Sequence, residues 1–515
     1  MSVEIVRGVN EPVDLDQSVY GIDPTTGLFR HPVAAPYATG ERPVKGSLTY
    51  PEDREYIHNM TVEGRWSNLV IPGVSFQNIV DMNGRRYMYH YYRSRVNVYD
   101  ITDPRNLKIL VEKNYEEPGS FFGAAAIAYN KSLGKWIMIQ SFEVPRGGPN
   151  GLNGAKYTDP ASVNRILGFK GFRGIKIYEL TGPTEWKLLS QVATDALNPR
   201  AKPQAGSGAL DSPTYYGGKY AMIAAAPDNT FVHQEYPNYL YSAAQMIFDV
   251  EEPANPRLVS TWWVPGQRLG EEADYKNWRQ YGNRTSWTGA RMPMVLDKPL
   301  EQGGRYGYTA MGGLGFHVLD LSDPNNIKVA GSVDLPLSVG GVEGDSVDAS
   351  RAMSRGLVLV NGYPMNEDGY EPYKDVYLID VKDPAKPAII GTLPRPVPPK
   401  GAPYSDFVLR RGKFGPKRSN YYWHPGQVDP NVVVFPFNTA GLQIFDITDP
   451  KNSKVTAYFV PRMTDAENST KYSKNPLECM AVEWDRKLIW GFANSGIYLL
   501  STPALGEPSM SAPLA

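Results

Sequence analysis

The sequence predicts an all-β fold, a seven-bladed β-propeller made of four-stranded antiparallel blades. Three observations predict it. A strand-like run that ends in an Asp-Pro-type turn occurs seven times, two further strand candidates precede each copy, and the copies lie 55 to 79 residues apart. This spacing suits one four-stranded blade with its loops and is too long for one coil of a solenoid. The anchor residues of the seven copies are Asp100, Glu179, Asp249, Asp320, Asp380, Asp446 and Ser501.

The turn explains why each copy ends a strand. In the first copy, Asp100 is followed by Ile-Thr-Asp and then by Pro104. The first carboxylate can accept hydrogen bonds from amides of the tight turn. Proline then fixes φ at a place where the sheet needs no amide donor. A fourth strand candidate follows each turn, such as residues 107–113, so each blade has four strands counted outward from the central axis.

The two ends of the chain are expected to meet in the last blade. The seventh copy stops after its third strand, near Leu505. Residues 66–72 resemble the fourth-strand runs 258–265 and 455–461, so we expect them to complete the last blade and close the ring. This divides the chain into an N-terminal extension that wraps the ring (1–65), the propeller (66–505) and a C-terminal tail (506–515).

The repeated strand resembles those of a known family. The run from Ala440 to Pro450, Ala-Gly-Leu-Gln-Ile-Phe-Asp-Ile-Thr-Asp-Pro, is similar to the LVIVD-repeat proteins, whose members look like β-propellers. The resemblance covers about residues 66–505. It implies the fold and does not imply a function, because propellers serve as enzymes, ligand binders and scaffolds.

Composition excludes several classes of partner. Lys and Arg number 53 against 54 Asp and Glu, so no global field attracts nucleic acid or an anionic membrane. The first residues lack the pattern of a signal peptide, and no apolar run reaches the roughly 20 residues of a membrane helix. The single cysteine, Cys479, suits a reducing compartment. We therefore expect a cytoplasmic protein with a small-molecule substrate and with neither a nucleic-acid nor a membrane partner.

The extra length of the chain lies in loops on one face of the ring. Six long loops, at about 143–173, 227–242, 266–288, 363–374, 396–422 and 461–475, all connect strands on the same side. Loops of this length in a compact domain are usually functional or disordered. Their aromatic residues favour a packed lid, and we expect it to bury several of Trp278, Trp287, Tyr421, Tyr422 and Trp423.

Beneath this lid, the innermost strands place a row of side chains at the mouth of the central channel. The row comprises Phe76, Gly123, Leu210, Arg291, Glu343, His424 and Glu478. Blades one to three supply apolar groups and blades four to seven supply charge, which suits an amphipathic organic molecule. The residues expected to bind substrate are Phe76, Asn78, His90, Leu210, Ser212, Asp345, Tyr422, Trp423 and Asn438.

The charged part of the row has three interpretations. Arg291, Glu343 and Glu478 with His424 can form a structural ion-pair ring around channel water. They can instead perform acid/base chemistry, with His424 as general acid or base, Glu343 or Glu478 orienting it, and Arg291 holding an anionic or carbonyl oxygen. A divalent metal on Glu343, His424 and Glu478 is the third interpretation, which the neighbouring arginine disfavours.

Two classes of function follow. The first is a cytoplasmic enzyme without a cofactor that acts on a small aromatic or otherwise amphipathic metabolite as a lyase, hydratase, isomerase or hydrolase. The second is a ligand-binding or protein-interaction scaffold without catalysis. A divalent-metal-dependent hydrolase is a further alternative. An enzyme should fold its lid aromatics over a closed pocket, whereas a scaffold should expose them.

Overall fold

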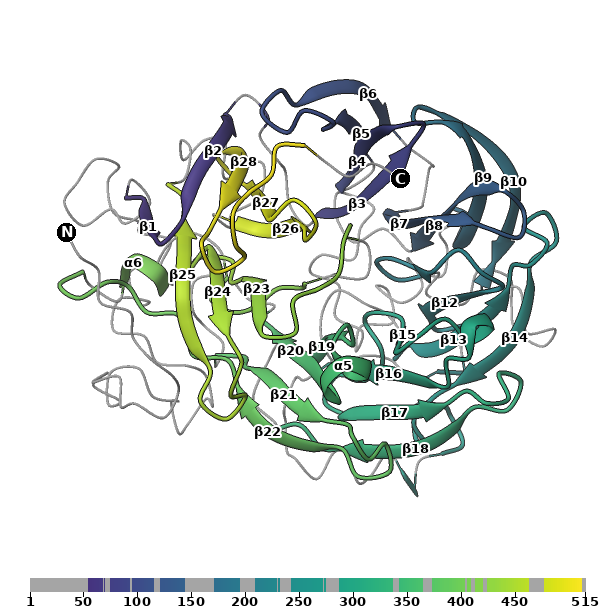
Figure 1. The fold of residues 1–515 in the computed structure, drawn as a ribbon. Helices are drawn as coiled ribbons and strands as arrows, with labels where there is room; N and C mark the ends of the chain where they lie inside the picture. Colours follow the sequence, from purple (N-terminus) through teal and green to yellow (C-terminus); the bar gives the residue numbers. More distant parts are fainter. Residues whose placement is uncertain are drawn as a thin grey trace.

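Seven four-stranded antiparallel sheets form a closed ring, which confirms the predicted seven-bladed β-propeller (Figure 1). The computed structural model describes residues 54–67, 69, 75–92, 95–114, 121–143, 171–194, 209–228, 230–231, 242–271, 273–274, 287–336, 342–364, 373–402, 405–408, 413–419, 424–462 and 477–511. Most of the six long loops lie outside these residues. Among the described residues, no helix is long and apolar enough to cross a membrane.

The first five blades each use four consecutive strands, the innermost first. Blade 1 contains β3 (Ser75–Met82), β4 (Arg85–Tyr92), β5 (Arg95–Asp100) and β6 (Lys108–Asn114). Blade 2 contains β7 (Phe121–Asn130), β8 (Lys135–Glu143), β9 (Gly174–Gly182) and β10 (Glu185–Ala193). Blade 3 contains β11 (Thr214–Tyr215), β12 (Tyr220–Ala225), β13 (Ala244–Asp249) and β14 (Arg257–Trp262). Blade 4 contains β15 (Val295–Leu296), β16 (Tyr306–Ala310), β17 (Phe316–Asp320) and β18 (Lys328–Val333). Blade 5 contains β19 (Val342–Asp348), β20 (Leu357–Tyr363), β21 (Val376–Asp380) and β22 (Ala388–Thr392).

The last two blades each take a strand from the N-terminal part of the chain. Blade 6 contains β23 (Val432–Pro436), β24 (Leu442–Asp446), β25 (Lys454–Val460) and, outermost, β1 (Tyr56–His58). Blade 7 contains β26 (Leu477–Glu483), β27 (Leu488–Ala493), β28 (Gly496–Ser501) and, outermost, β2 (Thr61–Trp66). The described helices are short: η3 (Leu300–Gln302), α5 (Ala352–Arg355) and α6 (Ser405–Val408).

The anchor aspartates cap the turns that they begin, as the sequence predicts. Oδ1 of Asp100 accepts the amide of Thr102 at 3.0 Å. The same bond, two residues along the chain, recurs from Asp249, Asp320, Asp380 and Asp446 at 2.8 to 3.0 Å. Each carboxylate therefore closes the turn between the third and fourth strands of its blade.

The same turns dock each blade onto the blade before it. Each fourth strand from blade 2 to blade 5 has a bulge, and a small residue follows the extra one. Ser190 and Ser260 donate their hydroxyls to Pro253 and Pro324 carbonyls of the next blade, at 2.5 and 2.6 Å. Gly391 occupies the equivalent place in blade 5, where an added Cβ would lie 2.2 Å from the carbonyl oxygen of the next proline. Only a small residue admits this contact.

An N-terminal strand closes the ring, but it is not the segment expected. The sequence placed it at residues 66–72, whereas β2 pairs with β28 from Thr61 opposite Ser501 to Trp66 opposite Ile497. The bulge sets this register, because Gly64 follows the extra residue of β2 just as glycine does in blades 4 and 5. The boundary expected at residue 65 thus falls inside a blade, and residues 1–53 lie outside the described residues.

The innermost strand expected to end at Val428 in blade 6 is also absent, since residues 424–431 form bends and turns rather than a strand. Pro425, Pro430 and Gly426, whose φ is 86°, are incompatible with a regular ladder. The carbonyl of Pro425 accepts the amide of Trp484 at 2.9 Å, so this segment still covers the inner edge of blade 7. The fourth strand of the sheet is β1, whose Tyr56 hydroxyl donates to Asp406 of α6.

A buried arginine joins the first and last blades. Arg86 is fully buried and binds Asp81 of its own blade at 2.6 Å and Glu483 and Asp485 of blade 7 at 2.6 and 2.7 Å. Ion pairs of Arg86 therefore close the ring together with the backbone hydrogen bonds of β2.

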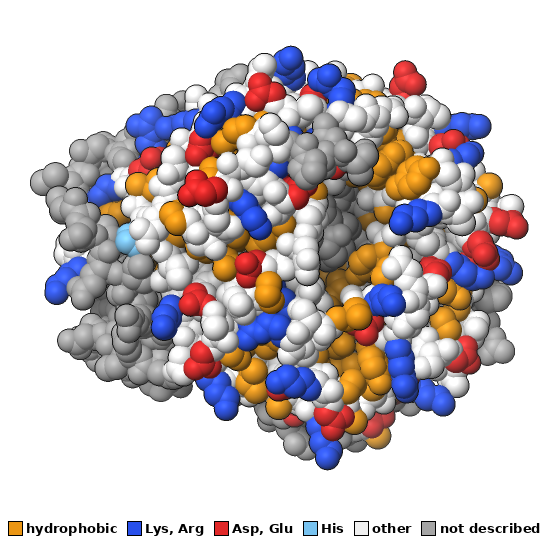
Figure 2. Space-filling model, in the orientation of Figure 1, with side chains coloured by type: hydrophobic (Ala, Val, Ile, Leu, Met, Phe, Trp, Pro, Cys, Tyr) orange, Lys and Arg blue, Asp and Glu red, His pale blue; other side chains and the backbone are white. Residues whose placement is uncertain are grey.

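The surface seen in Figure 2 differs from this buried cluster. It carries side chains of both charge signs interspersed around the rim, with a hollow at its centre.

We expect Arg86→Met to destabilise the protein by about 3 to 5 kcal/mol, because it leaves three carboxylates at the closure without their shared cation. Arg85→Met is the matched control. Arg85 pairs with Asp100, but its side chain is 52% exposed, so its removal should change the melting temperature little. Equal melting temperatures for the two variants would show that Arg86 does not hold the ring closed.

Candidate functional site

The innermost strands are irregular at one end of the axis, the end where the six long loops attach (the lid end). Bulges interrupt β7 between Phe122 and Ala125, β19 between Val342 and Ser346, and β26 between Leu477 and Cys479. In blades 3 and 4 the innermost strands are only two residues long. Bulges of this kind re-aim side chains and are common beside active sites. Of the residues expected at the channel mouth, Gly123, Glu343 and Glu478 fall in the bulges, and Leu210 and Arg291 lie just before the short strands. Phe76 lies in the regular strand β3.

Four charged side chains from different parts of the ring meet there (the axial network). Asp345 of β19 binds Nη1 of Arg291 at 2.8 Å and Nε of Arg418 at 2.5 Å. Nη2 of Arg418 also lies 3.1 Å from Asp211, and Nε of Arg291 lies 3.7 Å from the same carboxylate. All four side chains are at most 4% exposed. The network spans blades 3 to 5 and the connection between blades 5 and 6.

The arginines keep Asp345 charged despite its burial. Burial alone would raise the pKa of this carboxyl, but the guanidinium groups of Arg418 and Arg291 outweigh it, so the pKa lies below its ordinary value. A buried charge of this kind costs several kcal/mol unless it is paired. The axial network is therefore arranged to hold ionised groups away from water.

Residues 413–419 carry Arg418 to the network and are held between two blades. The amide of Lys417 donates to Pro436 of β23 at 2.8 Å, and the side chain of Asn361 in β20 donates to the carbonyl of Lys417. Asn438, expected to bind substrate, instead donates its side-chain amide to Gly415 at 2.8 Å. Its φ of 50° is the left-handed conformation that asparagine tolerates. In these contacts Asn438 positions the segment.

Three cations surround the buried ring of Tyr363. Nζ of Lys413 donates to its hydroxyl at 2.7 Å. Nζ of Lys417 lies 4.0 Å from the ring centroid, and the guanidinium carbon of Arg291 lies 4.5 Å from it. Such contacts with a ring face stabilise cations that have left water. Tyr363 therefore links the axial network to the lysines of residues 413–419.

Glu343 lies in the bulge of β19 and is buried. Nζ of Lys374, also buried, lies 3.7 Å from its Oε1. The strand pairing sets Val342, its neighbour, opposite Tyr363, so the Glu343–Lys374 pair and the tyrosine belong to the same end of blade 5. The structure thus brings Glu343, Asp345 and Arg291 to one end of the axis. Arg291 binds Asp345 rather than Glu343 in the contacts described.

His424 contacts the inner edge of blade 7. Its Nδ1 accepts the amide of Val482 at 3.3 Å, so the neutral ring carries its proton on Nε2. Burial lowers the pKa of His424 to about 3. In this state the ring is a neutral hydrogen donor, whereas the sequence suggested a general acid or base. The side chain of Glu478, its expected neighbour, lies outside the described residues.

The remaining expected residues are buried where they can be described. Phe76 faces Arg418, whose guanidinium carbon lies 5.5 Å from the ring centroid. Leu210 packs in one apolar cluster with Trp287 and Tyr363. Ser212 donates its hydroxyl to Pro213 at 3.2 Å. Asn78 donates its side-chain amide to the carbonyl of Gln77, also at 3.2 Å.

His90 lies against aromatic rings of blades 1 and 7, those of Tyr99 and Phe492. It is fully buried, its ring centroid is 4.5 Å from that of Phe492, and burial lowers its pKa to about 3. Trp287 is buried as expected. The other aromatic residues expected in the lid lie outside the described residues: Trp278, Tyr421, Tyr422 and Trp423. The expected binding of substrate by Tyr422 and Trp423 therefore stays a prediction.

Sequence reasoning missed several members of this site, namely Asp211, Tyr363, Lys374, Lys413, Lys417 and Arg418. None of them stands in the repeated strand pattern by which the axial row was aligned. A usable signal existed for two of them: Lys417 and Arg418 form a basic pair within a long loop that attaches at the lid end. A basic pair there has to be solvated, paired with carboxylates or available to a ligand.

The side chains that can be described do not form a complete set of metal ligands. Within the described ranges, no three His, Cys, Asp or Glu side chains gather closely enough to hold a metal ion. The metal interpretation named Glu343, His424 and Glu478, of which the last side chain lies outside those ranges. Metal dependence therefore stays a prediction.

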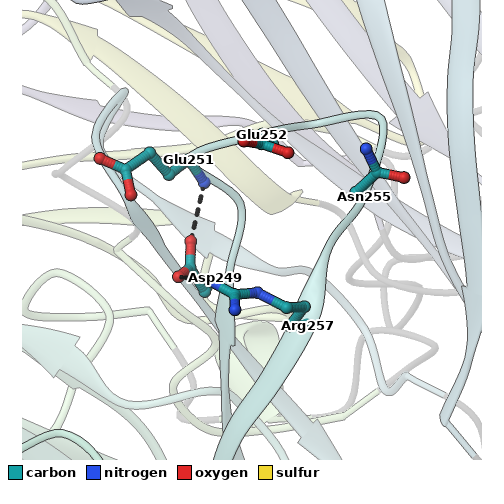
Figure 3. A pocket seen from close by; sticks show the side chains of 5 residues that line it. All are labelled: Asp249, Glu251, Glu252, Asn255 and Arg257. Atoms are coloured by element: carbon teal, nitrogen blue, oxygen red, sulfur yellow. Dashed lines mark hydrogen bonds and ion pairs between the residues drawn. The ribbon is translucent and has the colours of Figure 1, made fainter.

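A second hollow, of about 250 Å³, lies on the surface of blade 3, far along the blade from the axis. It is lined by Asp249, Glu251, Glu252, Asn255 and Arg257 (Figure 3). Asp249 caps its own turn through the amide of Glu251, and Arg257 binds it at 2.9 Å. These contacts serve the repeated turn, so we assign this hollow no function.

Comparisons with known proteins do not assign this chain to a family. No family model matches the sequence, and no curated protein resembles it significantly. The periplasmic gluconolactonase PpgL of Pseudomonas aeruginosa is similar in structure, with 12% identity, 85% of this chain and 94% of that chain covered, and a TM-score of 0.47. A hypothetical selenium-binding protein of Sulfolobus tokodaii is 11% identical over 67% and 84% of the two chains, with a TM-score of 0.31.

These likenesses are too distant to carry function. The class of protein is established by the seven sheets themselves: a seven-bladed β-propeller. The resemblance to LVIVD-repeat proteins stays a prediction, since no family model supports it.

Two of the buried histidines, His90 and His424, predict a pH dependence of stability. Both have an ordinary pKa of 6.5 when unfolded and about 3 when folded. Between these values the unfolded chain binds more protons, so stability falls as the pH drops below about 6.5. Between pH 6.5 and 5 each histidine should cost about 2 kcal/mol.

Melting temperatures of the wild type and of His90→Met, measured from pH 7.5 to 5.0, test this. The variant should lose less stability on acidification than the wild type, because one of the two histidines no longer titrates. Parallel curves for the two proteins would show that the burial of His90 does not contribute.

Proposed function

We propose that this propeller is an enzyme that acts on a small amphipathic metabolite by general acid/base chemistry at the lid end of its axis. The observation that supports it most is the coincidence of irregular innermost strands with a buried group of charged residues. The bulge of β19 places both Glu343 and Asp345 there, and Arg291 and Arg418 approach from other parts of the ring. Its reaction class remains that of a lyase, hydratase, isomerase or hydrolase, working in the cytoplasm.

The energetics favour a functional origin for this group. Buried ion pairs are often no more stabilising than apolar side chains of the same size, because desolvation offsets the attraction. The junctions between blades 2 and 3, 3 and 4, and 5 and 6 already have the turn contacts described above, which lie away from the axis. Charged groups shielded from water at a loop-bearing face are typical of active sites.

The contacts assign different roles from those expected. Arg291 and Arg418 hold Asp345 and Asp211, so they position the site and shape its field. We assign Glu343, which lies beside Lys374 in the bulge, the exchange of a proton with substrate. Tyr363 with Lys413 supplies a hydroxyl that can stabilise a developing negative charge. Burial of Trp287 supports a closed pocket over a scaffold with exposed aromatics.

A metabolite panel tests the proposal. Purified protein is incubated with lactones, hydroxy acids, unsaturated acids and aromatic esters, and consumption is followed by mass spectrometry at pH 6 to 9. We expect the wild type to convert at least one class and Glu343→Gln, which keeps the shape of the side chain, to be slower by about 10² to 10⁴.

Glu251→Gln is the matched control, since that glutamate is 62% exposed in the turn of blade 3. Its turnover and melting temperature should equal those of the wild type. Glu343→Gln should also lose stability, because it removes the carboxylate beside buried Lys374, so turnover is compared at a temperature at which both variants are folded. Full activity in Glu343→Gln, or no conversion of any compound by the wild type, would contradict the proposal.

A further inference from the structure

One lid-end turn of blade 6 has the same backbone as its counterpart in blade 4. Residues 437–441 join β23 to β24, and residues 311–315 join β16 to β17. The first amide of each turn donates to the carbonyl of the fifth residue, at 2.7 Å in blade 6 and 2.9 Å in blade 4. The second and fifth residues have positive φ in both turns, 50° and 68° in blade 6 and 62° and 87° in blade 4. The two turns are therefore structural equivalents.

The equivalent turns differ in their second and third residues. Blade 4 has Gly312 and Gly313 there, whereas blade 6 has Asn438 and Thr439. Glycine adopts positive φ at little cost, and asparagine is the side chain that tolerates it best. The backbone of this turn thus requires neither the asparagine nor the threonine. We look for the role of the two side chains in what they contact.

The chain that covers the turn differs in the same way. In blade 4 the carbonyl of Trp287 accepts the amide of Gly313 at 2.7 Å, and an added Cβ on Gly312 would lie 2.7 Å from the indole ring. In blade 6 the carbonyl of Lys413 takes the same place and accepts the amide of Thr439 at 3.1 Å. Blade 6 therefore has no indole against its turn, and side chains fit there that blade 4 excludes.

Both side chains of the blade 6 turn keep a buried polar atom for which the described part of the chain supplies no hydrogen-bond partner. Asn438 and Thr439 are fully buried. The amide nitrogen of the Asn438 side chain donates to the carbonyl of Gly415 at 2.8 Å, and this contact fixes which end of the amide is the oxygen, because a carbonyl only accepts. The two atoms left are Oδ1 of Asn438 and Oγ1 of Thr439. Since an unmade hydrogen bond of a buried group costs free energy, the pair points to a ligand.

The chemistry of the two atoms selects a hydroxyl group. An amide oxygen only accepts, whereas a threonine hydroxyl donates and accepts. A hydroxyl group can donate to the first atom and accept from the second. A carbonyl or carboxylate oxygen satisfies the threonine alone. An ammonium group would bring a charge to a buried place with two neutral partners, which costs more than the burial of a hydroxyl.

Apolar residues adjoin the turn. Phe437 precedes Asn438, Phe414 pairs with it through an isolated bridge, and the amide of Leu477 donates to its carbonyl at 3.3 Å. All three are buried. The turn also contacts residues 413–419, which carry Arg418 to the axial network. A ligand that reaches the turn from this network would meet apolar side chains beside the two polar atoms.

We propose that the substrate has an apolar body and a hydroxyl group, and that Oδ1 of Asn438 and Oγ1 of Thr439 bind this hydroxyl. This inference rests on the proposed function, because it names a chemical group of the substrate of the same site. A buried water offers the same O–H group. The position of the turn at the lid end, next to the segment that carries Arg418, favours the substrate, and the experiments below separate the two sources.

Melting temperatures without ligand test whether the free protein already binds the Thr439 hydroxyl. Thr439→Val keeps the shape of the side chain, so it should melt at or above the wild-type temperature if nothing binds this hydroxyl. Thr309→Val is the matched control. Thr309 is 1% exposed and accepts a hydrogen bond from Gln245 at 2.8 Å, so this variant should melt lower. A decrease as large in Thr439→Val as in Thr309→Val would show that the protein or a buried water holds the hydroxyl, and would overturn the inference.

Three probes of similar shape test the ligand chemistry: 1-phenylethanol, acetophenone and 1-phenylethylamine. Each is titrated into the whole chain by calorimetry. The alcohol both donates and accepts, the ketone only accepts, and the amine carries a charge at neutral pH. We expect the alcohol to bind about tenfold more tightly than the other two, or better, because the ketone leaves Oδ1 of Asn438 without a donor. Equal binding of the alcohol and the ketone, or no binding of the alcohol at millimolar concentration, overturns the inference.

Variants locate the bound alcohol. Thr439→Val should weaken its binding about tenfold, which corresponds to the loss of one hydrogen bond, and Thr439→Ser, which keeps the hydroxyl, should retain most of it. Thr448→Val, at an exposed position in the outer turn of the same blade, is the control and should bind like the wild type. Wild-type affinity for the alcohol in Thr439→Val overturns the assignment to this turn.

The two proposals fail in different ways. Binding of the alcohol that depends on Thr439, without turnover of any compound, would leave this inference standing and contradict the proposed enzyme. Turnover that is lost in Glu343→Gln and unchanged in Thr439→Val, with no preference for the alcohol, would support the enzyme and overturn the hydroxyl site.

Discussion

The contact between one blade's Asp-Pro turn and the fourth strand of the blade before it is the constraint on which the ring depends. The anchor aspartate shapes the turn, and the proline carbonyl then meets a serine or glycine that follows a bulge in the preceding blade. Because this contact recurs at several junctions near the outer strands, as a serine hydrogen bond or as a close approach at glycine, it fixes how these blades pack independently of the axis. The closing strand β2 shares the bulge and the small residue after it, Gly64.

Blades fixed at their outer strands leave the innermost strands free to depart from regular pairing. They do so at the lid end, where β7, β19 and β26 bulge, β11 and β15 are two residues long, and blade 6 has no regular inner strand. These departures bring Asp211, Arg291 and Asp345 together, and residues 413–419 add Arg418. The regular part of the repeat thus builds the ring, and its irregular part builds the candidate site.

The same division explains what the sequence could reveal. Blade number, strand order and closure by an N-terminal strand could be predicted, because the turn signal repeats and the last copy lacks a fourth strand. The register of that strand could not be predicted. The apolar run 66–72 resembled other fourth strands, whereas the strand that pairs is β2, with its bulge before Gly64. Alternation along the inner strands pointed to Arg291, Glu343 and Asp345. Their partners Asp211, Lys374 and Arg418 come from outside the aligned rows, and His424 lies in a segment where Pro425 and Gly426 break the strand.

Our central claim is that the axial network serves a bound substrate and is not what holds the ring together. The most direct measurement is the melting temperature and probe affinity of a protein whose network is replaced as a whole, by Asp211→Asn, Arg291→Met, Asp345→Leu and Arg418→Met. Replacing all four residues together leaves no charge of the axial network without its partner inside the network, so the account predicts a folded protein that melts near the wild-type temperature and has lost its affinity for small ligands. A protein that melts far below the wild type, or that still binds the same ligands, would contradict it.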